Sequence, residues 1–208
     1  RADFFADCHA LAVKAIYGRP EDIPGIVLVD GEMVKVLSGF ACDNDGQLKQ
    51  ELEGLRERFN EILKAGDGAD ADSYGICELG KAVIAGYDFR NNVWRVALEA
   101  FQATVKAVEG KTPAQKQALL KTGGAWVEAI YSLPPAESEF RSAFQQVAEA
   151  VEGKSDAQAL AIGKIAASML AAMAREPEVI AKSRPAFAQV AEAVAGKPDA
   201  QAQALGEI

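Results

Sequence analysis

The second half of the chain repeats itself with a period of 43 residues. Each copy opens on a Phe and carries a Gly-Lys pair nine and ten positions later, in segments 101–111, 144–154 and 187–197. Ala-Gln pairs then follow at 114–115, 157–158 and 200–201. A fainter copy begins at Phe59. A fixed period of this length is typical of proteins built from one helical unit, because a single unit cannot bury its apolar face alone.

Each copy is predicted to form a helix, a short turn and a second helix. The Phe and the residues three and seven positions further on share one helix face, so we expect buried anchors at Phe101, Phe144 and Phe187. A left-handed Gly beside a Lys is expected to end each first helix. These glycines are Gly110, Gly153 and Gly196. The expected N-caps or near-caps of the second helices are Thr112, Ser155 and Asp199.

Ala and Glu, both strong helix formers, are abundant along the whole chain. The predicted helices are Ala2–Tyr17, Gln47–Ala65, Asp70–Ala85, Phe89–Glu109, Pro113–Tyr131, Ala136–Glu152, Asp156–Arg175 and Glu178–Ala195, with a last helix from Asp199. Segment 23–40 is ambiguous, because a hairpin around Asp30-Gly31 and a helix both fit its apolar spacing. A lone hairpin is marginal in water, so irregular backbone followed by a helix from about Asp30 is favoured.

The predicted fold is all-α, an elongated antiparallel helical bundle built partly from the 43-residue units. The chain is expected to form one helical domain over 1–208, with an irregular or helical segment at 1–45 and helical repeats over 59–208. A rod is favoured over the alternative α-solenoid, because Ala lies on more than one face of the helices. These alanines are Ala148, Ala150, Ala171, Ala172 and Ala174.

The chain is acidic, with a net charge of −8 and a pI near 4.8. Negative charge repels phosphate backbones, and no basic stripe interrupts it, so nucleic acid is excluded as a partner. The longest uninterrupted apolar run considered, at 26–29, is far shorter than the ~20 residues that span a bilayer. Because the chain begins at Arg1, any targeting or anchoring signal is expected outside it.

The cysteines, Cys8, Cys42 and Cys77, all lie in the first 77 residues. Three reduced thiols, or one disulfide and one thiol, both fit this distribution. With His9 as the single His, no spaced zinc site is possible, and the asparagines form no glycosylation sequon. Adjacent residues of a helix point about 100° apart, so Cys8 and His9 are not expected to form a nucleophilic pair.

Acidic and Gly-rich loops give no binding motif. Segment 43–46 (Asp-Asn-Asp-Gly) resembles part of a calcium loop but places Ala41 and Leu52 where carboxylates belong. Segment 66–71 fits a loose phosphate-binding pattern, but it follows a predicted helix and carries two carboxylates. Both are interpreted as turns and caps, as is acidic segment 67–72. The Gly123-Gly124 pair also lacks a phosphate-loop frame.

No catalytic, cofactor-binding or metal site is predicted, and the protein is expected not to be an enzyme. Glu137 and Glu139 would serve as an acid and base only across a cleft, and at a helix start they complement the helix dipole. Trp94 and Trp126 lie in neighbouring predicted helices and are interpreted as core packing.

An acidic, Ala/Glu-rich helical chain with few cysteines resembles the surface-coat proteins of African trypanosomes, especially the glutamic acid/alanine-rich type of the insect stage. The resemblance lies mainly in 89–208, in Ala-Glu-Ala-Val at 148–151, with Ala-Glu-Ala-Val at 191–194, and in the Gly-Lys turns. It implies an extracellular protein that shields the plasma membrane beside neighbouring coat molecules. It also implies a glycosylphosphatidylinositol anchor whose signal would lie beyond Ile208. The Gly-Ile-Val-Leu-Val-Asp-Gly run at 25–31 departs from that type.

Two other functions are compatible with a helical chain of this kind. An intracellular helical-repeat scaffold that binds a partner protein is the alternative, because the 43-residue period lies in the ~40–47 range of HEAT and armadillo repeats. A small-molecule carrier would need a cavity with large apolar walls, and no residues are found for one.

Overall fold

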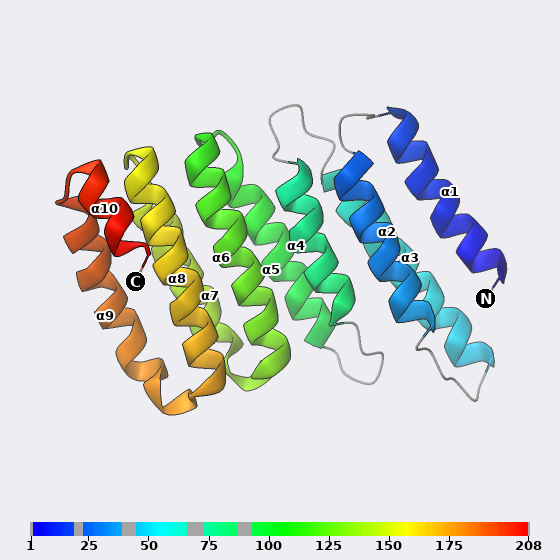
Figure 1. The fold of residues 1–208 in the computed structure, drawn as a ribbon. Coiled ribbons are helices and arrows are strands. Elements are labelled where there is room, and N and C mark those ends of the chain that lie inside the picture. Colours follow the sequence, from blue (N-terminus) through cyan, green and yellow to red (C-terminus); the bar gives the residue numbers. More distant parts are fainter. Residues whose placement is uncertain (1, 19–22, 39–44, 66–72, 87–92, 208) are drawn as a thin grey trace. The chain divides into compact units, whose positions relative to one another are not determined.

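The all-α prediction is confirmed by the computed structural model (Figure 1). The structure describes residues 2–18, 23–38, 45–65, 73–86 and 93–207, which form helices and short turns and contain no strand. The helices are α1 (Ala2–Gly18), α2 (Ile23–Ser38), α3 (Asp45–Ala65), α4 (Ser73–Ala85), α5 (Val93–Val108), α6 (Pro113–Ser132), α7 (Glu137–Ala150), α8 (Asp156–Arg175), α9 (Ile180–Ala195) and α10 (Asp199–Leu205).

Most helix boundaries agree with the sequence-based ones. Helices α6 and α8 begin at the predicted Pro113 and Asp156. Helices α7 and α9 begin one or two residues late, because Pro134–Ala136 (η2) and Pro177–Val179 (η3) first form a 3-10 turn. The predicted starts at 70 and 89 lie outside the described residues, and α4 and α5 are described from 73 and 93.

The prediction for 23–40 is wrong, because α2 is one continuous helix from Ile23 rather than irregular backbone before Asp30. Four of its apolar residues recur at helical spacing on one face and are buried: Ile26, Val29, Met33 and Leu37. Burial of this face outweighs the poor helix propensity of the β-branched residues and of Gly25 and Gly31. Pro24 lies in the first turn, where its missing N–H costs no hydrogen bond.

The helices divide into two compact units, Arg1–Trp94 and Arg95–Ile208. In the first unit, α2 packs along α4, while α1 contacts α2 and α3, and α3 contacts α4. Gly25 permits the close approach of α2 and α4, since a Cβ there would lie 2.9 Å from the Cβ of Cys77. Phe59 and Ile62, which begin the faint first copy of the repeat, are fully buried.

In the second unit the repeats lie side by side. Helix α6 packs along α8, and α8 packs along α10, while α7 contacts α9 (Figure 1). Successive helix pairs of this unit therefore stack sideways, as in the α-solenoid alternative. The predicted anchors Phe101, Phe144 and Phe187 are confirmed, with at most 3% of each exposed.

The turns of the repeat follow the predicted pattern with one exception. Gly110 and Gly153 adopt φ values of 68° and 67°, in the left-handed region that favours Gly. Thr112 and Ser155 each cap the following helix in a capping box. The prediction for Gly196 is wrong.

The exception has a local cause in the third copy. Gly196 has a φ of −83°, and its N–H donates to Glu192 as α9 ends. Pro198 takes the N-cap position of α10, so Asp199 is the first helical residue. The residue before a Pro is disfavoured in the helical region, so the chain leaves α9 here without a left-handed Gly.

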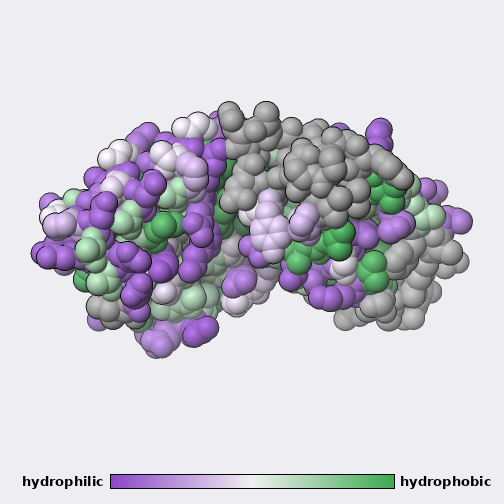
Figure 2. All heavy atoms as spheres, turned by 45° about the horizontal axis from the view of Figure 1, so that its top comes forward, coloured by the Kyte–Doolittle hydropathy of each residue, from purple (hydrophilic) through white to green (hydrophobic). Residues whose placement is uncertain are grey.

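Two observations bear on the surface of the second unit. On the face that Figure 2 presents, this unit is mostly hydrophilic, and hydrophobic residues are scattered among hydrophilic ones. Within the described ranges, α8 is the one helix long and apolar enough to cross a membrane by length and composition. It is not identified in the sequence when only uninterrupted apolar runs are considered. Core helices have the same property, and α8 buries Ile162, Ala166 and Leu170 between its neighbours.

Candidate binding groove

Arginines hold both carboxylates of the acidic pair at the start of α7. Glu137 accepts a hydrogen bond of 2.7 Å from the Nε atom of Arg141. A second nitrogen of the same guanidinium donates to Glu99 at 2.9 Å. Glu139 lies 3.9 Å from a guanidinium nitrogen of Arg184. The Glu137–Arg141 pair lies within α7, whereas Arg141–Glu99 joins α7 to α5 and Glu139–Arg184 joins α7 to α9.

Cys8 and His9 form no nucleophilic pair. The Nδ1 atom of His9 lies 3.3 Å from a carboxylate oxygen of Asp30 on α2, at the surface. Cys8 is buried, and this burial raises the pKa of its thiol from 9.0 to about 11. At neutral pH the side chain is therefore the uncharged thiol, which is a poor nucleophile.

The loops considered for calcium or phosphate binding lie largely outside the described residues. Segments 66–71 and 67–72 lie outside them, as do residues 43–44 of the calcium-like segment, whereas Asp45 begins α3. Cys42 also lies outside the described residues. In the part of the chain that the structure describes, no three His, Cys, Asp or Glu side chains are grouped for a metal ion. Trp126 is buried and stacks on Phe144 with ring centroids 4.9 Å apart, so its predicted core role is confirmed.

The capping glutamines have a second role that the sequence pattern did not predict. Gln115 accepts from the backbone N–H of Thr112, and its Nε2 donates to the carbonyl of Val151 in the next repeat at 3.0 Å. Gln158, 43 residues later, caps Ser155 and donates in the same way to the carbonyls of Ala195 and Lys197. In the first two copies one Gln side chain thus both caps a helix and joins two repeats, whereas α10 of the third copy begins without a side-chain cap.

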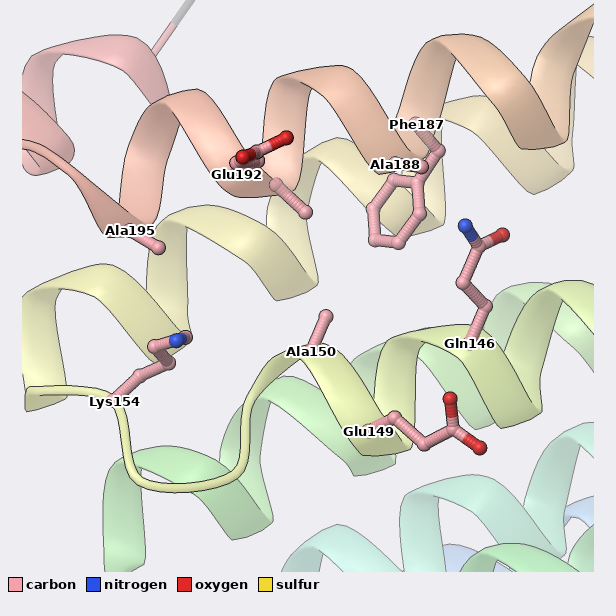
Figure 3. Close-up of a pocket in the computed structure, with 9 residues that line it drawn as sticks. Gln146, Glu149, Ala150, Lys154, Phe187, Ala188, Glu192 and Ala195 are labelled. Atoms are coloured by element: carbon pink, nitrogen blue, oxygen red, sulfur yellow. The ribbon is translucent and has the colours of Figure 1, made fainter.

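One hollow of the second unit is a groove between α7 and α9 (Figure 3). It has a volume of about 370 Å³ and is lined by Gln146, Glu149, Ala150, Lys154, Phe187, Ala188, Ala191, Glu192 and Ala195. A second hollow of about 320 Å³ shares Gln146 and Ala188 with it and extends past Arg184 to Ile180. The two adjoin along the pair of helices, and the α9 wall carries Ala188, Ala191 and Ala195 beside Phe187 and Glu192.

The groove is open because α9 carries alanines where α7 carries longer side chains. Ala195 and Ala188 are the counterparts, 43 residues on, of Glu152 and Gln145. In the preceding pair of repeats, the carboxylate of Glu152 forms an ion pair with the ammonium of Lys111 at 3.0 Å. Lys154 is the counterpart of Lys111, and no carboxylate of the described residues pairs with it. One wall of the groove thus ends in Lys154, which lacks the carboxylate that its counterpart Lys111 has in Glu152.

Gln146 adds a second unsatisfied group to the groove. Its side chain points from α7 toward α9 (Figure 3), and its Nε2 donates to the carbonyl of Arg184 at 3.4 Å. Its Oε1 atom is buried and accepts no hydrogen bond from the residues that the structure describes. A buried acceptor without a donor costs about 1–3 kcal/mol, so an N–H group bound here would be favoured.

The first unit has a groove between α1 and α3. It measures about 500 Å³ and is lined by Asp7, Ala10, Leu11, Lys14, Arg56, Glu57 and Asn60. The carboxylate of Asp7 and the guanidinium of Arg56 lie 3.6 Å apart across it. Elsewhere in this unit, the buried guanidinium of Arg58 lies 3.1 Å from the ring centroid of Trp94, so this Trp carries a cation–π contact in addition to packing.

Comparisons with known proteins return no relatives. No protein-family model, no curated protein and no solved structure matches the chain.

Proposed function

We propose that this protein is a non-enzymatic helical-repeat module that binds an acidic segment of a partner protein in the groove between α7 and α9. The single observation that carries the proposal is Lys154, which lines this groove beside Ala195. Its counterpart Lys111 pairs with Glu152, and the repeat places Ala195 where that carboxylate would be. A carboxylate supplied by a bound partner would complete the same ion pair.

The other lining groups support a protein ligand. The buried Oε1 of Gln146 offers an acceptor for a backbone or side-chain N–H of the bound segment. Ala188 and Ala191 leave room for side chains of that segment along α9. Stacked helical repeats commonly bind extended segments along such surfaces, because their grooves run continuously from repeat to repeat.

The experiment is a selection from a random peptide library displayed against the 208-residue chain. We expect the selected peptides to share an Asp or Glu at one position. Ala195→Glu places a carboxylate beside Lys154 and should weaken their binding at least about tenfold, which corresponds to 1.4 kcal/mol. Lys164→Glu, on α8 and outside the groove lining, is the matched control and should leave binding unchanged. Peptides without a shared acid, or binding insensitive to Ala195→Glu, would contradict the proposal.

The surface-coat role and the lipid anchor remain predictions from the resemblance to trypanosome coat proteins, as does the location at the cell surface. A coat protein needs no occupant in the groove, whereas the partner-binding module does. Labelling of intact cells with a membrane-impermeant reagent separates the two. Labelled protein together with a failed peptide selection would favour the coat, and unlabelled protein with acidic binders would favour the module.

A further inference from the structure

A second cation, Arg184 of α9, lines the hollow that adjoins the groove between α7 and α9. Its counterpart 43 residues earlier is Arg141. The guanidinium of Arg141 donates to Glu137 at 2.7 Å and to Glu99 at 2.9 Å. Both distances lie in the range of charge-assisted hydrogen bonds. Arg141 therefore shows that an arginine at this position of the repeat can hold two carboxylates at once.

Arg184 lacks both of these carboxylates, because uncharged residues occupy the corresponding positions. The counterparts of the two are Ile180 and Ser142. Among the described residues, the ionic partner of Arg184 is Glu139, at 3.9 Å. That distance is too long for a hydrogen bond, so Glu139 leaves the N–H donors of the guanidinium available. Since Arg141 holds two carboxylates, Arg184 has room for a carboxylate from a bound molecule.

Arg184 and Lys154 lie toward opposite ends of the groove. Arg184, Ala188 and Ala195 share one face of α9, because they are spaced by four and seven residues. Figure 3 shows Lys154 near Ala195, and Arg184 precedes Ala195 by eleven residues. At a rise of 1.5 Å per residue, about 16 Å of helix separates the two ends. Each end therefore offers one cation that lacks the carboxylate bound by its counterpart.

The stretch between the two cations is acidic and contains a hydrogen-bond acceptor. Glu149 and Glu192 line this stretch. Gln146 lines both hollows, and its buried Oε1 accepts no hydrogen bond from the residues that the structure describes. Like charges repel, so an acidic side chain is disfavoured in the middle of the groove and favoured at its two ends. The charges along the groove thus run positive, negative, positive.

We infer that the bound segment carries two carboxylates, one for Lys154 and one for Arg184, with uncharged or basic residues between them. This inference rests on the proposed function and specifies its ligand. The segment is extended, because N–H groups in the interior of a helix are bonded within that helix. An extended backbone can donate one of its N–H groups to Gln146.

The extended backbone also sets the spacing of the two acids. Its residues advance about 3.3 Å each, and alternate side chains share one face. Two acids on the groove side are therefore an even number of residues apart. Separations of four and six residues span about 13 Å and about 20 Å, which bracket the distance between the two ends of the groove. Lysine and arginine side chains are flexible enough to take up the difference.

The test compares fluorescent peptides that are titrated into the 208-residue chain and followed by anisotropy. One peptide has a single Glu among uncharged polar residues. Two others have a second Glu four or six residues away, and a fourth has two adjacent Glu in the middle. We expect one of the spaced peptides to bind at least about tenfold more tightly than the single-Glu peptide. The adjacent pair, which has the same net charge, should give no such gain.

Two variants of the chain test the role of Arg184. Arg184→Gln should reduce the affinity of the spaced peptide to that of the single-Glu peptide. Lys182→Gln removes the same charge from α9 but lies outside both hollows, so it is the matched control and should have no effect. Ile180→Glu restores a carboxylate four residues before Arg184 and should also weaken binding of the spaced peptide. Circular dichroism checks that each variant is folded.

The outcomes separate this inference from the proposed function. Equal affinity of the spaced and adjacent peptides, or equal effects of Arg184→Gln and Lys182→Gln, would overturn the inference. The proposed function would still hold if Ala195→Glu weakened binding of the single-Glu peptide. Binding that Ala195→Glu does not affect, or no binding by any of the peptides, would overturn both. The comparison of peptides on the wild-type chain requires no variant to fold.

Discussion

Gly163 of α8 lies so close to Ala118 of α6 that a Cβ on Gly163 would be 2.6 Å from both the Cα and the Cβ of Ala118. The contact recurs 43 residues later, where a Cβ on Gly206 would lie 2.8 Å from the Cα of Ala161. Small residues at these positions allow the second helices of successive repeats to approach closely. The spacing of the repeats in the second unit therefore depends on single side chains.

Gly163→Ala should destabilise the protein. The added methyl group meets the backbone of Ala118, which cannot turn aside as a flexible side chain would, so α6 and α8 must separate. Overpacking of this kind typically costs about 1–3 kcal/mol in the free energy of unfolding. Urea unfolding followed by circular dichroism measures the loss.

The matched control for this substitution is Gly124→Ala in α6. A Cβ on Gly124 would meet nothing within 4 Å, so the change should stabilise the helix by about 0.5–1 kcal/mol through its propensity. Equal stability of the two Ala variants would contradict the close-packing explanation.

Gln115→Ala and Gln115→Glu should separate the two roles of the capping glutamine. The Ala variant loses both the cap and the bridge to Val151, while Glu keeps an acceptor for Thr112 but loses the donor to the next repeat. We expect both to be destabilised by about 1–3 kcal/mol, since each leaves a buried carbonyl without a donor. Thermal unfolding measures this, with exposed Gln145→Ala as the control. A Gln115→Glu variant as stable as the wild type would show that the bridge contributes nothing.

Phe144→Ala should cost about 3–5 kcal/mol, the usual loss for a buried aromatic side chain. The ring is 3% exposed and stacks on Trp126, so removing it also changes the surroundings of that indole. Chemical unfolding gives the stability change, and tryptophan fluorescence of the folded variant reports the lost contact. Val190→Ala, at an exposed position, should change neither quantity substantially. An unchanged unfolding midpoint for Phe144→Ala would contradict the prediction that the Phe of each repeat is a core residue.

The buried thiol of Cys8 should make stability fall at alkaline pH. Its native pKa is raised by burial from 9.0 to about 11, so the unfolded thiol ionises first as the pH rises. The contribution of Cys8 is fully present below pH 9.0 and is lost as the pH rises through about 11. Urea unfolding across this range, compared with Cys8→Ala, measures the difference. Parallel pH profiles for the two proteins would count against a buried thiol at this position.

The helices of the second unit and their turns could be predicted from the sequence because their causes are local. The spacing from Phe144 to Gly153, and the Ser155 cap that follows, specify a helix, a left-handed end and a new helix within one stretch of chain. The same reasoning failed at Ile23 and at Gly196. At Ile23, burial against other helices outweighed Gly and β-branched residues, and at Gly196 the neighbouring Pro198 ended the helix in another way.

The groove depends on which helices become neighbours, and a single repeat does not contain that information. Ala195 looks like an ordinary member of an Ala-rich helix in the sequence. It opens a groove because Lys154, in the turn between α7 and α8, is placed opposite it. Helix formation follows from contacts a few residues apart, whereas this groove arises from side chains about 40 residues apart that packing brings together.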